Sequence, residues 1–353
     1  MPAGELPSVP SILTRRQILQ TAQSIAAAQE PDGALPWFPG GHTDPWDHIE
    51  SAMALTVAGL RDEAVAAYTW SARTQRPDGS WPRQFRAGEI EDPATDVNFC
   101  AYLATGVWHY LAITGDTAFA ADLWPVVAAA IDLVVASQGE HGEIYWLRDG
   151  DKVLPEALVT GSASMYHSIG AALALARRFG DPRPEWETAR DRLGRALRDH
   201  PEVFTRKDRY SMDWYYPVLG GALRGQPGYD RISERWDTFV VGNIGIRCVS
   251  DRPWVTGAET CELVLSLDAL GDRDRALGLL ASIQHLRETD GSYWTGLVYA
   301  DGKRWPVERT TWTGAAVILA ADALSRATAG NGIFRDLAAD AVPGRAVPVR
   351  VTG

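Results

Sequence analysis

One short pattern occurs four times along the chain, each time behind an alanine- and leucine-rich segment. A Gln is followed by Asp-Gly or His-Gly and then by Trp, at residues 29–37, 75–81, 138–146 and 284–294. Such self-similarity predicts an array of similar helical units. We expect each glycine to adopt the left-handed conformation at a helix C-terminus and each Trp to fold back onto the helices.

The spacing of apolar residues predicts twelve helices and no long strand. They span residues 14–29, 45–60, 62–75, 95–114, 117–138, 161–180, 184–199, 215–224, 229–240, 257–270, 272–285 and 310–327. Twelve such helices bury their apolar faces by closing into a ring of six inner and six outer helices. This all-α arrangement resembles the (α/α)6 toroid of six-hairpin glycosidases and of terpene cyclases and prenyltransferases. We expect a single catalytic domain over residues 1–335 and a flexible tail over 336–353.

Composition excludes several classes of partner. The chain has 353 residues and a net charge of −11, which disfavours binding to nucleic acid or to an anionic membrane surface. The three cysteines are too few and too scattered for a disulfide framework, and the first residues do not resemble a signal peptide. We therefore expect a soluble, cytoplasmic protein, whose oligomeric state the sequence leaves open.

Polar and aromatic residues collect where alternate helices begin. In a closed ring the inner helices all start at one end, so these residues should surround one mouth. Carboxylates, hydroxyls and indoles around a funnel suit carbohydrate, because sugar rings offer apolar faces to Trp and hydroxyls to polar groups. The candidate substrate contacts are Trp46, His48, Glu50, Asp96, Asn98, Tyr166, His167, Asp213, Tyr215, Tyr216, Trp254, Glu259, Trp294, Arg309 and Trp312.

Several of these candidates have ordinary structural alternatives. Asp96 and Asn98 can simply begin a helix, His167 can be a hydrogen-bonded core histidine, and Tyr215 and Tyr216 can plug the ring. Trp312 and Arg309 carry the same ambiguity. The four Trp of the repeat, including Trp294, are better explained as packing residues that close the ring.

Glycoside hydrolysis requires two carboxyl groups, and two helix starts each offer an acidic pair. Asp47 and Glu50 are three residues apart, as are Glu259 and Glu262, so each pair shares a helix face. Capping boxes behind Asp44 and Thr256 are the alternative for these segments. Asp47 and Glu262 stand among apolar neighbours, where an unpaired carboxylate is costly, so we predict them as the catalytic pair.

Other chemistries lack a recognisable motif. No His or Cys spacing matches a metal site, and there is no phosphate-binding glycine loop and no nucleophile elbow. We therefore expect neither a metal nor a cofactor.

Three segments resemble one particular family. They are Pro36–Ser51, Arg252–Leu263 and Asp290–Gly296, and together they are similar to actinobacterial hydrolases of methylmannose polysaccharide, whose homologues are often labelled prenyltransferase. The resemblance implies an endo-acting α-mannosidase that cuts α-1,4-linked 3-O-methylmannose chains, with Asp47 and Glu262 as its acidic pair. Because toroidal glycosidases mostly invert, it also implies inversion. We prefer Asp47 as the acid and Glu262 as the base, and the opposite assignment of the two roles stays open.

Two alternatives stay open. An isoprenoid cyclase or prenyltransferase would need an Asp-rich motif or zinc ligands, and Asp44-Pro-Trp-Asp47 is the nearest approach to either. A carbohydrate-binding toroid without catalysis would keep the aromatic residues but would tolerate Asp47→Asn and Glu262→Gln.

Overall fold

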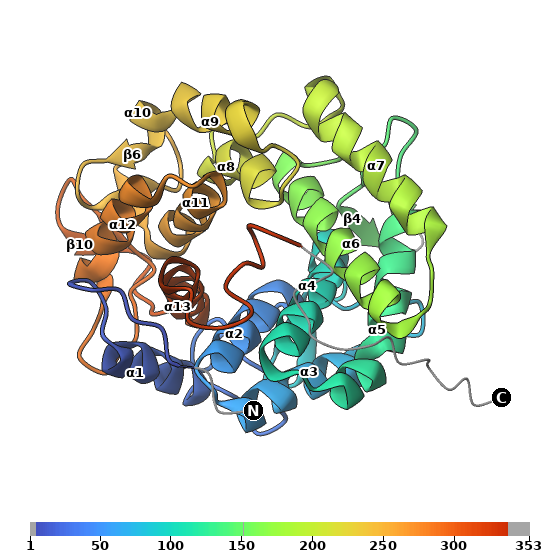
Figure 1. Cartoon of the computed structure of the whole chain (residues 1–353), viewed down its shortest axis with the longest axis horizontal. Helices are drawn as coiled ribbons and strands as arrows, with labels where there is room; N and C mark the ends of the chain where they lie inside the picture. Colours follow the sequence, from blue (N-terminus) through green and yellow to red (C-terminus); the bar gives the residue numbers. More distant parts are fainter. Residues whose placement is uncertain (1–4, 151, 338–353) are drawn as a thin grey trace.

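The helices form two concentric rings. The computed structural model describes residues 5–150 and 152–337. Six inner helices each contact the next, and the last contacts the first, so the ring closes (Figure 1). They are α2 (Pro45–Val57), α4 (Val97–Thr114), α6 (Val159–Phe179), α8 (Ser211–Leu219), α11 (Gly257–Leu270) and α13 (Thr311–Ser325). The predicted (α/α)6 toroid is confirmed.

The outer helices pack in the grooves between neighbouring inner helices. They are α1 (Arg15–Ala26), α3 (Arg61–Thr74), α5 (Thr117–Ala136), α7 (Pro184–Asp199), α9 (Gly225–Glu234) and α12 (Arg273–Ser282). Short helices α10 (Trp236–Phe239), η1 (Pro201–Val203) and η2 (Ile283–Leu286) extend the connections. Every residue of α2 is buried, whereas α7 is charged on its outward side, as expected for an inner and an outer ring.

Helix α8 departs from its prediction because it begins four residues early, at Ser211 rather than 215. Pro217 lies inside this helix and lacks the N–H that would bond to the carbonyl of Asp213. The guanidinium of Arg231 donates to that carbonyl instead, at 2.8 Å. A side chain from α9 thus repairs the helix that the proline would otherwise interrupt.

Short antiparallel strands of two to four residues occupy the loops that lead into α4, α6, α11 and α13. The described residues contain β1 (Gln84–Arg86), β2 (Glu89–Asp92), β3 (Thr95–Asp96), β4 (Leu147–Asp149), β5 (Lys152–Val153), β6 (Val240–Val241), β7 (Gly245–Arg247), β8 (Trp254–Thr256), β9 (Gly296–Val298) and β10 (Lys303–Arg304). The largest sheet has the order β10-β9-β8-β7-β6. These strands reinforce the end of the ring at which the inner helices begin, and they are too short to give a sequence alternation.

The repeated motif joins each outer helix to the next one. Its glycines have positive φ, between 85° and 101°, but they sit in turns beyond the helix ends rather than at the helix C-termini. A Cβ on each glycine would overlap backbone of the next outer helix: Gly33 meets α3, Gly79 meets α5, Gly142 meets α7 and Gly291 meets α1. The last contact joins the loop before α13 to α1, so the fourth copy of the motif helps to close the ring.

The glutamine of the motif strengthens the same junction. In the first three copies its amide nitrogen donates both to the carbonyl of the motif glycine and to a carbonyl of the next outer helix, at 2.8–3.1 Å. These pairs are Gln29 with Gly33 and Glu63, Gln75 with Gly79 and Val126, and Gln138 with Gly142 and Ala189. Gln284 differs, because it lies in η2 and its amide donates to the carbonyl of Leu280 in α12, just before it.

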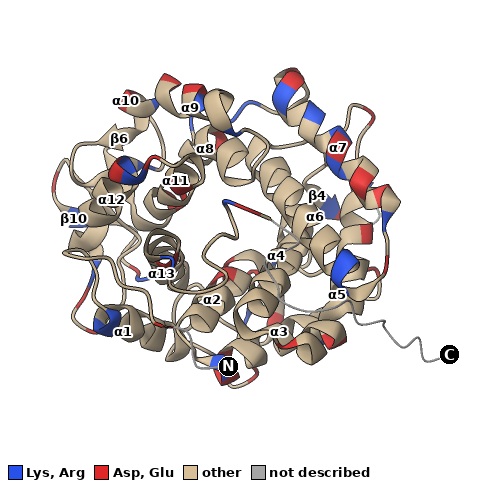
Figure 2. Ribbon diagram, in the orientation of Figure 1, with Lys and Arg blue, Asp and Glu red and all other residues tan. Residues whose placement is uncertain are grey.

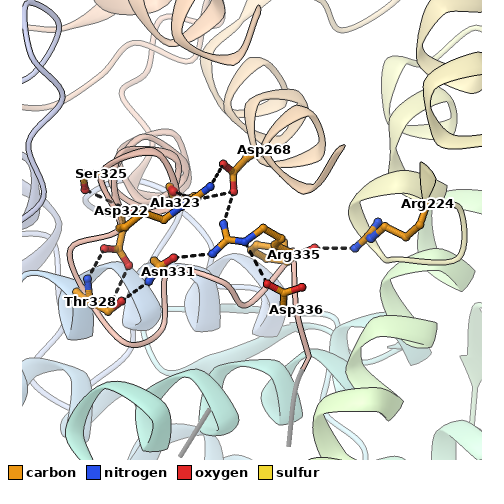
Figure 3. A network of polar contacts seen from close by, with 11 residues as sticks. Arg224, Asp268, Asp322, Ala323, Ser325, Thr328, Asn331, Arg335 and Asp336 are labelled. Atoms are coloured by element: carbon orange, nitrogen blue, oxygen red, sulfur yellow. Dashed lines mark hydrogen bonds and ion pairs between the residues drawn. The ribbon is translucent and has the colours of Figure 1, made fainter. Parts of the chain in front are cut away.

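The segment after α13 crosses the end of the ring at which the inner helices finish (Figure 1). Polar contacts hold it: Arg335 binds the carboxylate of Asp268, at the end of α11, at 2.6 Å (Figure 3). Arg326 binds the same carboxylate at 2.8 and 2.9 Å. Arg224 donates to the carbonyl of Phe334 at 2.7 Å. We call residues 326–337 the floor segment. Residues 338–353, most of the predicted tail, lie outside the described residues.

Helix α5 is the one described helix that is long and apolar enough to cross a membrane. Its buried residues, among them Trp124, Ile131 and Val134, pack in the wall of the ring, as those of a core helix do.

Charged residues lie mostly on the outer helices and loops, as Figure 2 shows for α1 and α7.

Candidate active site

Three carboxyl groups meet where the inner helices begin. Asp47 and Glu50 lie on the first two turns of α2, and Glu262 lies on the second turn of α11. All three are buried, with exposures of 6, 2 and 2% respectively. Burial and the charges of neighbouring carboxyl groups, Glu50 and Glu262 among them, raise the pKa of Asp47. We call these three residues the acid cluster.

Two tyrosines hold Glu262. Tyr216 donates to its Oε1 at 2.5 Å, and Tyr215 donates to Oε2. Both come from α8, and their adjacent positions let one short helix serve both oxygens of the carboxylate. Burial and the charge of Glu50 raise the pKa of Glu262 well above its ordinary value, while these two hydrogen bonds act in the opposite direction by stabilising the ionised form.

Asp47 has an acidic environment. Burial raises its pKa well above the ordinary value, and so do the neighbouring carboxyl groups, Asp44 first among them. Asp44 is the N-cap of α2, as the sequence indicated, and accepts from the backbone of Trp46 and Asp47 at 3.0 and 2.9 Å. Asp47 is therefore the member of the cluster best suited to hold a proton near neutral pH.

Glu50 has a hydroxyl partner that the sequence analysis missed. Tyr102 donates to its Oε2 at 3.2 Å, and burial raises the pKa of Glu50 to about 8. Tyr102 lies four residues after Asn98 on α4, and this i, i+4 spacing could have placed it on the same inward face. Its ring also packs against Trp46, with centroids 4.8 Å apart.

Beside the acid cluster lies a cavity of about 180 Å³. It is lined by Trp46, Asp96, Asn98, Phe99, Trp146, Leu158, Thr160, Gly161, Met212 and Tyr216. Four of the predicted sugar contacts thus share one cavity. Asp96 also caps α4, and burial raises its pKa to about 7.

Indoles surround the entrance. Trp312 lies 5.8 Å from Trp46 and 5.6 Å from Trp37, measured between ring centroids, and Trp37 stacks on His42. Trp146 lines the cavity, and Trp37 contacts Trp312, although the repeat had suggested a packing role for both. Trp214, by contrast, is fully buried and stacks on Phe239, so it is a core residue rather than a sugar platform.

Glu259 is not used in a capping box. Thr256 is the N-cap of α11, but its side chain makes no cap hydrogen bond. The Oε2 atom of Glu259 is buried and without a hydrogen-bond partner among the described residues. The capping alternative for this glutamate was wrong. Burial, then the charge of Glu259 and its hydrogen bond with the thiol, raise the pKa of Cys248.

Three predicted contacts lie in the packed layers instead. The ring of His48 accepts from Leu35 N and donates to Ala67 O, because position 48 on α2 faces α3 rather than the mouth. The ring of His167 contacts Ile333 of the floor segment. Tyr166 faces α7, where Arg190 stacks over its ring at 4.0 Å. These three assignments were wrong.

Four further candidates do not line the cavity beside the acid cluster. Arg309 pairs with Asp290 and stacks over Trp294, beside a groove lined by α1 and by the start of α13. Asp213 accepts from Thr160 at 2.6 Å and lines a second groove next to the cavity. Trp254 packs edge-on against Trp305 in the five-stranded sheet. For Arg309 and Trp294 the structure shows an ion pair and a stacking contact, and their role as substrate contacts stays a prediction.

Among residues 5–150 and 152–337, no group of three His, Cys, Asp or Glu side chains is arranged to hold a metal. The three cysteines are free. The polar chemistry available at the mouth is therefore that of carboxyl groups, tyrosine hydroxyls and indoles.

Comparison with known proteins decides the family. No family model matches the chain. A protein of Mycolicibacterium hassiacum, MMP endo-(1,4)-3-O-methyl-alpha-D-mannosidase, is 67% identical over 330 residues, which cover 94% of this chain and 92% of the relative. This chain belongs to that family of mannosidases. The match selects the glycosidase over the isoprenoid enzyme among the possibilities that the sequence left open.

Solved structures of low identity share the fold of this mannosidase family member. A glycosidase in complex with glucose has a TM-score of 0.68 at 14% identity, covering 90% of this chain and 97% of its own. A rhamnosidase from Klebsiella oxytoca with rhamnose bound scores 0.62 at 14%, covering 90% and 65%. The cellobiose 2-epimerase of Spirochaeta thermophila scores 0.60 at 12%, covering 87% and 96%. Since hydrolases and an epimerase share this toroid, the fold alone does not define the reaction.

Proposed function

We propose that this chain hydrolyses internal α-1,4 bonds of 3-O-methylmannose polysaccharide. The observation that carries the proposal is the 67% identity, over nearly the whole chain, to a protein named as an endo-acting 3-O-methylmannosidase. The acid cluster supports it, because glycoside hydrolysis needs two carboxyl groups in opposite roles on either side of the bond.

The surroundings of the two predicted catalytic residues suggest their roles. Asp47 is flanked by Asp44 and Glu50, which favour its protonated form, so it suits the general acid. Glu262 accepts hydrogen bonds from Tyr215 and Tyr216, which favour its ionised form, so it suits the base. In this mechanism Asp47 protonates the departing glycosidic oxygen while Glu262 takes a proton from the attacking water.

We further propose that the anomeric configuration inverts. The direct test is proton NMR of the first product formed, before mutarotation, from an α-linked substrate. A β-anomer supports inversion, and an α-anomer would require Glu262 or Asp47 to act as a nucleophile instead.

A substrate panel tests the function as a whole. The purified protein is incubated with methylated and unmethylated α-1,4-mannans, an α-glucan and isoprenyl diphosphates, and the products are read by mass. We expect oligosaccharides of intermediate size from the methylated mannan, because an endo-acting enzyme cuts within the chain. Turnover of a diphosphate, or binding of mannan without cleavage, would contradict the proposal, and the latter would favour a carbohydrate-binding toroid.

The three free cysteines suit a reducing compartment, and we propose that the reaction takes place in the cytoplasm. Fractionation of cells that express the native chain, followed by activity measurement, tests this location.

A further inference from the structure

We propose that the 180 Å³ cavity beside the acid cluster is the subsite that recognises the 3-O-methyl group of the substrate. This inference rests on the proposed function, and it names the residues that set the preference for methylated over unmethylated mannose.

The cavity has an apolar wall. Phe99, Leu158 and Met212, with Trp146 behind them, come from the starts of α4, α6 and α8 and from the loop before β4. All four are only partly buried, so they line the opening instead of filling the core. In water, such a wall gains stability when an apolar group covers it.

The other side of the cavity is polar and has unfilled hydrogen-bonding positions. The Oδ1 atom of Asn98 and the Nε1 atom of Trp46 are both buried and have no partner among the described residues. Asp96 adds a carboxyl group whose pKa is about 7. A buried polar atom without a partner costs free energy, so these groups favour a ligand that supplies hydroxyls.

A 3-O-methylmannose ring has both chemistries on one edge, because its methoxy group is flanked by the substituents of neighbouring ring carbons. When the O2 hydroxyl donates to Asn98 and the glycosidic O4 accepts from Trp46, the methoxy group can cover Met212 and Leu158. An unmethylated sugar in the same position would bring a hydroxyl against the apolar wall. That hydroxyl would lose its water and gain no partner there.

The cavity is next to the proposed reacting bond. Tyr216 lines it and donates to Glu262 at 2.5 Å. Trp46 lines it and packs on Tyr102, the partner of Glu50. A sugar held there therefore lies beside the acid cluster, where a preference in binding also affects the rate of cleavage.

The test compares matched oligosaccharides, one methylated at each O3 and one unmethylated, in binding by calorimetry and in cleavage as kcat/KM. A pocket that selects a single methyl-sized group discriminates by about 10-fold or somewhat more. We expect that preference in the unaltered protein. Met212→Gln, which keeps the length of the side chain, and Leu158→Asn, which suits the N-cap position of α6, should each reduce it to about threefold or less.

The control is Val307→Gln, at an apolar side chain that is 81% exposed and does not line the cavity. It should keep the full preference. Equal binding of both oligosaccharides by the unaltered protein, or an undiminished preference in both folded variants, overturns the inference. Because binding is measured separately, a methyl preference without any cleavage would refute the proposed function and leave the subsite standing.

Discussion

The two ends of the ring treat buried carboxyl groups in opposite ways. At the floor, Asp268 is 4% exposed and is bound by the guanidinium groups of Arg326 and Arg335 (Figure 3). At the mouth, the acid cluster is equally buried, but the groups that shift its pKa values are other acids, tyrosines and an indole.

The difference separates structural acids from reactive ones. Paired with arginines, Asp268 fastens the floor segment to α11. Without a cation, the acids of the mouth resist ionisation, which keeps one of them protonated for acid catalysis. Asp268 is neutralised by arginines and has a structural role. The acid cluster has no such partners among the described residues, and it is the place where catalysis is proposed.

The largest expected effect is loss of activity at the mouth. Asp47→Asn and Glu262→Gln should each lower kcat/KM for the methylated mannan by about 10²–10⁴-fold, the contribution of a general acid or base. Neither should lower the melting temperature, because each removes a carboxyl group from a like-charged environment. Retention of cleavage in both variants would show that the acids are not catalytic.

The floor should respond in the opposite sense. Asp268→Asn leaves Arg326 and Arg335 without their carboxylate. Loss of one partner of a buried pair costs about 3–5 kcal/mol, and we expect roughly 2–3 because the arginines are partly exposed. Urea unfolding measures this loss. Activity per folded molecule should be unchanged, and a loss of activity in fully folded protein would contradict the separation of the two ends.

Glu50 offers a test through the pH dependence of stability. Its pKa in the folded protein is about 8, above the ordinary 4.5, so folding favours the protonated form. Its contribution is fully present below about pH 4.5 and is lost as the pH rises through 8. Glu50→Gln should therefore make the unfolding free energy fall less steeply over that range, by up to about 1.4 kcal/mol per pH unit. An unchanged slope would contradict a protonated Glu50.

The smallest effect concerns the tyrosines that hold Glu262. Tyr216→Phe removes a hydrogen bond that favours the ionised carboxylate, so the pKa of Glu262 should rise further. If Glu262 is the base, the acidic limb of the kcat/KM profile should move to higher pH by less than about one unit. Tyr299→Phe is the matched control. It also removes a tyrosine hydroxyl, but that hydroxyl follows β9 and accepts from Arg247 instead of contacting Glu262. A shift of the basic limb alone would reverse the assigned roles.

Much of the fold and part of the acid cluster could be predicted from the sequence. The repeat around Gly33 and Gly79 predicts a closed helical array, and the spacing of Asp47 and Glu50 predicts one acidic helix face. His48 was misplaced because it follows Asp47 directly, although one residue along a helix turns the side chain by about 100° toward the outer ring. Tyr102 was missed although it lies four residues after Asn98, because its partner Glu50 is 52 positions away along the chain.

The ion pairs of the floor segment could not be predicted from the sequence for a related reason. Asp268, Arg326 and Arg335 are ordinary charged residues in the sequence, and only the return of the chain across the ring brings them together. Most helix starts could be inferred from local patterns, but α8 and α9 each begin four residues before their predicted starts. The α8 boundary depended on Arg231 replacing the hydrogen bond lost at Pro217. Long-range pairing of this kind leaves no periodic signal.

The most direct test of the central claim is a crystal structure of the Glu262→Gln variant with a 3-O-methylmannose tetrasaccharide bound. We predict that a glycosidic oxygen lies within hydrogen-bonding distance of Asp47, and that the anomeric carbon faces the side chain that replaces Glu262. A tetrasaccharide bound only in the outer grooves, with the mouth occupied by water, would contradict it.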